Sequence, residues 1–152
     1  MPVGFIKDLG DIEASAVIYF RLWFDNPISQ EDVYSDFYTV LGAEDGENSL
    51  RSMKQLYQLF ADHGRRPLIR HDICCKCVGA DESCFGNLIA AAIEADQEDA
   101  MLLASLFVKP KVAPVLVILA KNFGLALKKI SYNSKNSKAL EYEFQSTGYT
   151  LH

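Results

Sequence analysis

All four cysteines of the chain are clustered between Cys74 and Cys84, a few positions after His71. Thiolates and imidazole nitrogens are soft or borderline donors, which suit zinc or an iron–sulfur cluster. The surrounding stretch lacks helical periodicity and contains Gly79, so the chain can turn around an ion there. The segment therefore predicts a metal site, with zinc or an iron–sulfur cluster as the cofactor.

The four-ligand set that this spacing favours is His71, Cys74, Cys77 and Cys84, with Cys75 as the alternative to Cys74. In a regular strand, Cys75 and Cys77 would share one face. A turn at Cys75 would instead bring Cys74 towards Cys77 across a two-residue gap, which is the spacing of zinc knuckles. Cys84 falls in the first turn of a predicted helix, where the amide dipoles favour a thiolate.

Two other interpretations of the same residues stay open. Free cysteines often serve as small, buried core residues, and the imperfect ligand spacing gives this interpretation slightly more weight than the metal. Closely spaced thiols also permit redox chemistry, and either Cys84 or Cys77 could act as a nucleophile, the former with His71 as its base. A cysteine-dependent enzyme or a thiol redox protein is therefore the alternative function.

Nothing else in the chain indicates catalysis. The sequence has no phosphate-binding glycine loop, no dinucleotide fingerprint, no His-Glu-x-x-His and no Gly-x-Ser-x-Gly. The basic residues Arg65, Arg66 and Arg70 could bind an anion, but a solvated turn explains them more simply. A protein that is not an enzyme is therefore favoured.

The charge is unevenly distributed along the chain. The net charge of −5 disfavours nucleic acid as a partner. Residues 1–62 carry 4 basic and 11 acidic side chains, whereas residues 109–152 carry 7 basic and 2 acidic ones. Oppositely charged regions, together with the aromatic residues of the first predicted helices, favour binding to a protein partner or to a second copy. We therefore expect a homodimer.

Apolar residues at helical spacing, with matching caps, predict six helical segments. Their predicted starts are Asp11, Ser29, Ser49, Asp81, Asp96 and Ala113. An acidic loop, Gly42–Asn48, is expected between the second and third segments. Short connections between the later segments favour neighbours packed side by side. The predicted fold is mainly all-α, a bundle of five to six helices in a single domain spanning residues 1–152.

A different pattern follows residue 131. Leu140, Tyr142 and Phe144 alternate with polar residues, which predicts a short half-buried strand that pairs with Leu68–Ile73. The bundle is thus expected to carry a small irregular or two-stranded β appendage. Residues 131–152 are expected to form a loosely attached tail or strand.

The longest apolar stretch, Met101–Ala120, is interrupted by Lys109, Pro110, Lys111 and Pro114, so no membrane span is expected. No secretory leader is recognisable at the start, and clustered cysteines are typical of reduced thiols or metal sites in the cytoplasm. The expected function is that of a small cytoplasmic helical interaction or regulatory protein, with metal bound in the His71–Cys84 segment as one form of it. A structural adaptor without metal is a further alternative.

Overall fold

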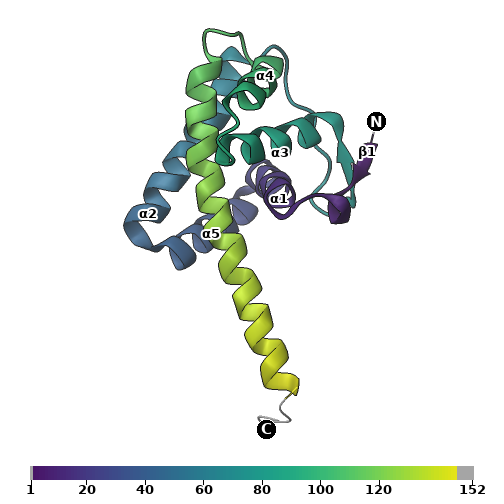
Figure 1. Ribbon diagram of the computed structural model, residues 1–152, viewed down its shortest axis with the longest axis vertical. Coiled ribbons are helices and arrows are strands. Elements are labelled where there is room, and N and C mark those ends of the chain that lie inside the picture. The colour runs from purple at the N-terminus through teal and green to yellow at the C-terminus, as the bar shows by residue number, and fades with distance from the viewer. Residues whose placement is uncertain (1, 147–152) are drawn as a thin grey trace.

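The computed structural model describes residues 2–146, with side chains described through residue 131. Five helices account for most of these residues, and two short strands form one small sheet (Figure 1). The mainly helical fold with a two-stranded appendage is therefore confirmed. The helices are α1 (Asp11–Asp25), α2 (Pro27–His63), α3 (Ala80–Ile93), α4 (Gln97–Phe107) and α5 (Ala113–Ser146). A short 3-10 helix, Ile6–Asp8, precedes them.

The core is rich in aromatic rings, and Tyr57 of α2 contacts rings from three other helices. Its ring centroid lies 5.6 Å from Phe20 of α1, 6.3 Å from Phe85 of α3 and 6.3 Å from Phe123 of α5. Tilted and edge-on ring pairs at such separations add to the energy of area burial. This cluster joins α1, α2, α3 and α5 into one core.

Helix α2 spans two of the predicted segments, which a kink at Gly42 separates. Gly42 has φ 85° and ψ 175°, a conformation that is almost restricted to glycine. The prediction of an acidic loop over Gly42–Asn48 is wrong, because Ala43 to Asn48 are helical. One residue with positive φ is enough to redirect the chain, so a loop of several residues is not needed.

Five of the six predicted helix starts hold to within two residues, whereas the segment expected from Ser49 is already helical from Ala43, directly after the kink. Asp96 caps α4 by accepting a hydrogen bond from the backbone N–H of Asp99 at 3.2 Å, as predicted. Helix α2 begins earlier than expected, since Asn26 rather than Ser29 is the cap and Pro27 occupies the first turn. Helix α3 begins at Ala80, with Gly79 in place of Asp81 as the cap.

The sheet forms elsewhere than predicted. Strand β1 (Pro2–Phe5) pairs antiparallel with β2 (Cys77–Gly79), so that Phe5 lies opposite Cys77. The predicted strand at Leu140–Phe144 is wrong, because these residues belong to α5, and its pairing with Leu68–Ile73 does not occur. Extending an existing helix needs no new nucleus, and Ala, Leu and Glu favour this extension.

Helix α5 crosses the bundle, and its C-terminal part extends beyond the other helices (Figure 1). The predicted tail, residues 131–152, thus begins as a continuation of this helix, and residues 147–152 lie outside the described part. Within residues 2–146, none of the helices combines the length and apolar character that crossing a membrane requires.

Candidate functional site

A buried ion pair contacts the backbone of the cysteine segment, residues 71–79. Arg21 of α1 and Glu82 of α3 are both essentially inaccessible to solvent. Arg21 Nε donates to Glu82 Oε2 at 2.6 Å, and Arg21 Nη2 donates to Oε1 at 2.9 Å. Such a two-point contact matches the planar guanidinium to the carboxylate and compensates part of the cost of removing both charges from water.

The same two side chains hold the backbone of the cysteine segment. Arg21 Nη1 donates to the carbonyl oxygen of Cys75 at 2.6 Å, and Nη2 donates to that of Cys77 at 2.7 Å. Glu82 accepts the backbone N–H of Gly79 at 3.1 Å and a second backbone hydrogen bond from His71. The conformation of residues 71–79 is therefore fixed by charged groups that are themselves shielded from water.

The environment of Glu82 keeps its carboxylate ionised. Burial raises the pKa of this carboxyl, but the hydrogen bonds from Arg21, Gly79 and His71 and the positive charge of Arg21 outweigh burial. The net result is a Glu82 pKa below the ordinary value of a glutamate. The ion pair thus stays charged at neutral pH, as its hydrogen-bond geometry requires.

Within the segment, the structure brings together one thiol and one imidazole. Cys75 Sγ lies 3.5 Å from Nδ1 of His71, within hydrogen-bond distance for sulfur. The chain reverses between them, because the N–H of Cys75 donates to the carbonyl oxygen of Asp72 at 2.9 Å. Both Cys75 and His71 are half-buried.

The other predicted ligands lie in different surroundings. Cys74 is exposed, and Cys77 is half-buried at the start of β2. No group of three or more His, Cys, Asp or Glu side chains suited to a metal ion occurs among the residues that the structure describes. His71 therefore pairs with Cys75, the residue that ranked second to Cys74 in the predicted ligand set, and the proposed Cys84–His71 pair is replaced by Cys75–His71.

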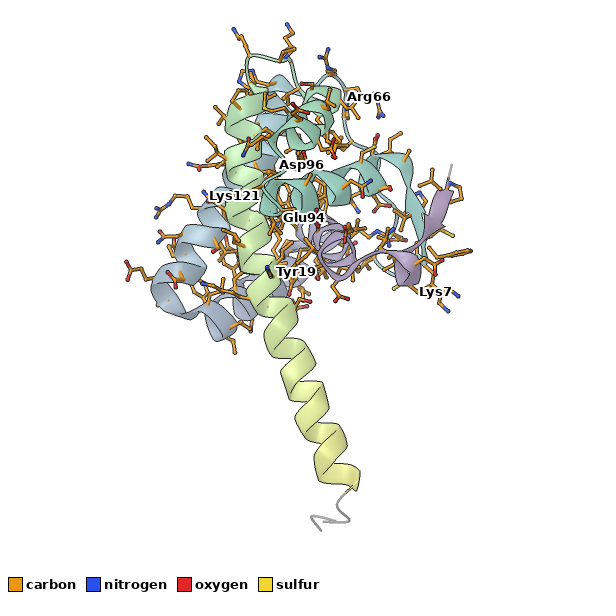
Figure 2. The ribbon with its side chains drawn as sticks, in the orientation of Figure 1. Lys7, Tyr19, Arg66, Glu94, Asp96 and Lys121 are labelled. Atoms are coloured by element: carbon orange, nitrogen blue, oxygen red, sulfur yellow. The ribbon has the colours of Figure 1, made fainter. Side chains whose placement is uncertain are left out.

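Cys84 lines a separate cavity of about 260 Å³ between the loop after α2, the start of α3 and the end of α4. Two arginines, Arg65 and Arg66, contribute to its lining. Arg66, labelled in Figure 2, forms a two-point ion pair with Asp81 through bonds of 2.8 and 2.5 Å. This contact is the largest cause of a lowered pKa at Asp81. Arg66 therefore binds a carboxylate of the chain itself, while Arg65 and Arg70 donate to backbone carbonyl oxygens.

Arg21 and Glu82 were not recognised as site residues from the sequence. A signal was nevertheless present, since Arg21 is the one charged residue in the apolar run from Ala16 to Phe24. A cation inside such a run is seldom left without an anionic partner. Glu82 stands three positions after Gly79, the spacing of a capping box, but nothing local links it to Arg21.

Comparison of the chain with protein-family models, with curated proteins and with solved structures finds no match.

Proposed function

We propose that the protein is a small helical interaction protein that binds through the exposed face of α5, and that a second copy of the chain occupies this face. The observation that carries the proposal is a stripe of apolar and basic residues on α5 that no element of the described chain covers. Val115, Ile118 and Leu125 are 50%, 61% and 42% exposed. Their spacing of three and seven residues places them on one side of the helix.

Lysines flank this apolar stripe. Lys121, Lys128 and Lys129 are exposed on the same helix, and Lys121 is labelled in Figure 2. Exposed single apolar residues are ordinary, but a row of them along one helix bordered by like charges is typical of a binding surface. A partner for this stripe needs apolar side chains and negative charge.

The neighbouring part of α2 supplies such charge. Glu44, Asp45 and Glu47 are exposed just after the kink at Gly42. Between this region and α5 lies a cavity of about 320 Å³, whose lining includes Leu41, Asp45, Leu125 and Lys129. Acidic α2 and basic α5 thus border the same hollow.

A two-fold axis near this hollow would place the α5 stripe of each copy against the acidic α2 surface of the other. Interfaces between identical chains are commonly of this self-complementary kind. Opposite charges would meet across it and fix the register, while the apolar residues would supply the buried area. The C-terminal part of α5 extends beyond the other helices (Figure 1). Because an isolated helix is only marginally stable in water, contact with a second copy would stabilise this part.

Sedimentation velocity at micromolar concentrations tests this proposal. We expect a species of twice the 17.0 kDa chain mass, and we expect it to dissociate as salt is raised. Ile118→Glu should convert it to the single chain by placing a carboxylate among apolar contacts. Leu102→Glu is the matched control, since Leu102 is 68% exposed on α4, outside the stripe. A single-chain mass throughout, or equal effects of the two substitutions, would overturn the proposal.

The metal site remains a separate proposal. Zinc or an iron–sulfur cluster bound by His71, Cys74, Cys77 and Cys84 would require the 71–79 segment to rearrange, because the described structure gathers no three such ligands. Elemental analysis of protein purified without chelator tests it. One metal per chain that is lost in Cys77→Ser and Cys84→Ser would support this ligand set, whereas no metal, or full retention in both variants, would eliminate it.

A further inference from the structure

We propose that Cys75 is a reactive thiol, with His71 as its base, that exchanges with small disulfides to form a mixed disulfide. This is a modification site in addition to the interaction face on α5. Three observations carry the proposal: the contact between the two side chains, the hydrogen bonds that hold the segment, and the partial exposure of both residues.

The contact has the arrangement of a nucleophile and its base. Nδ1 of His71 lies 3.5 Å from Cys75 Sγ, so it can take the thiol proton. A thiolate is the reactive form of cysteine in disulfide exchange. Of the four cysteines, which are all within the described residues, Cys75 alone has a hydrogen bond to a histidine ring.

One buried ion pair positions both partners. Arg21 holds the carbonyl oxygen of Cys75, and Glu82 holds the backbone N–H of Gly79, against which the His71 ring lies. The imidazole is also packed against Gly79, because a methyl group there would come within 3.0 Å of Nε2 of His71. The pair therefore needs little reorganisation before it reacts, which is the condition for an effective site.

The exposed charges that flank Cys75 in the segment have opposite signs, so they favour neither an anionic nor a cationic reagent. Asp72 and Lys76 are the exposed charged neighbours in the segment, and they have opposite signs. The guanidinium of Arg21 binds the carbonyl oxygen of Cys75, so it contacts the backbone of this residue. Cys75 and His71 are both only partly buried, and a small disulfide of the glutathione class is the reagent that the proposal requires.

The step conserves atoms and electrons. His71 takes the proton from Cys75 Sγ, and the thiolate attacks one sulfur of the reagent. A bond forms between Cys75 Sγ and that sulfur, and the sulfur–sulfur bond of the reagent breaks. The second half leaves as a thiolate and takes up the proton from His71. Cys75 is oxidised to the mixed disulfide, and one half of the reagent is reduced to a thiol.

Brief treatment of the whole protein with oxidised glutathione or iodoacetamide at neutral pH, followed by peptide mapping, tests the proposal. We expect Cys75 to react first, ahead of the more exposed Cys74 and ahead of Cys84 beside Arg66. Because Cys74 and Cys75 are adjacent, parallel measurements on Cys74→Ser and Cys75→Ser assign the reacting sulfur. Loss of the fast phase only in Cys75→Ser would support the assignment.

The role of His71 has its own comparison. His71→Gln should slow the reaction of Cys75 at least about tenfold, in line with the loss of a positioned base. His63→Gln is the matched control, since His63 is exposed at the end of α2. Circular dichroism of each variant checks that the helices persist. Fastest reaction at Cys74 or Cys84, or equal rates in the two histidine variants, would overturn the proposal.

Discussion

Arg21 and Glu82 lie 61 positions apart in the sequence, yet their side chains meet in the protein interior at 2.6 Å. The contact joins α1 to α3, and through the carbonyl oxygens of Cys75 and Cys77 it also joins both helices to the segment that leads into β2. A buried pair of this kind is costly to break, because the remaining charge stays in a medium of low polarity. Substituting either residue therefore tests how strongly the stability of the bundle depends on this ion pair.

Arg21→Met should lower the free energy of unfolding by about 3–5 kcal/mol, since it leaves Glu82 buried without its cation. Urea unfolding followed by circular dichroism measures the effect. Arg66→Met is the control, because Arg66 pairs with Asp81 while 60% exposed, and its loss should lower the free energy of unfolding far less than the loss of Arg21. Similar costs for the two substitutions would contradict the assignment of the Arg21 pair as buried.

Acid should destabilise the protein through Glu82. The pKa of Glu82 is lower in the folded chain than in the unfolded chain. Its contribution to the free energy of unfolding is therefore complete above the unfolded pKa and is lost as the pH falls through the folded pKa. We expect the urea midpoint to fall as the pH drops below about 4.3, the ordinary glutamate value.

Glu82→Gln should lower stability at neutral pH but flatten this acid dependence. Asp81→Asn provides the comparison, since the pKa of Asp81 is also lowered but its ion-pair partner, Arg66, is exposed. An unchanged acid slope in Glu82→Gln would show that other carboxyl groups control the transition.

Tyr57→Phe should leave stability unchanged or raise it slightly. The hydroxyl of Tyr57 is buried and has no hydrogen-bond partner within the described residues, and burial raises its pKa. Removing an unpaired buried polar group while keeping the ring relieves a desolvation cost. Thermal unfolding measures the change.

Tyr19→Phe is the matched substitution. The Tyr19 hydroxyl donates to Asp36 Oδ2 at 2.7 Å, so its removal should cost about 0.5–1.5 kcal/mol. Both tyrosine rings are buried, and therefore opposite signs of the two effects would report the hydrogen bond of the Tyr19 hydroxyl. A loss at Tyr57 as large as that at Tyr19 would indicate a partner for the Tyr57 hydroxyl.

Gly42→Ala should destabilise α2 by about 1–3 kcal/mol, because φ is 85° at this position and a side chain is strained there. The space around Gly42 is open, so the cost comes from the backbone and not from a clash. Gly4→Ala, also in open space but without positive φ, should change stability by less than about 0.5 kcal/mol. Equal effects in urea unfolding would argue against the kink.

The sequence by itself determined where most of the helices begin. Apolar spacing and caps are local properties, and the Asp96 cap of α4 is found where it was expected. Local pattern was ambiguous at Leu140–Phe144, where three alternating apolar residues fit a strand. The helix that precedes them decided the outcome, since its continuation needs no new nucleus.

Only the tertiary structure decided the composition of the candidate site. The cluster of cysteines was visible in the sequence, but the choice of Cys75 as the partner of His71 depends on the turn at Asp72 and on Arg21, more than 50 positions away. The partners of Arg21 are set by the packing of α1 against α3, which depends on the shapes of both helices. Residue type and spacing do not encode such contacts locally, because they arise only when distant segments share one core.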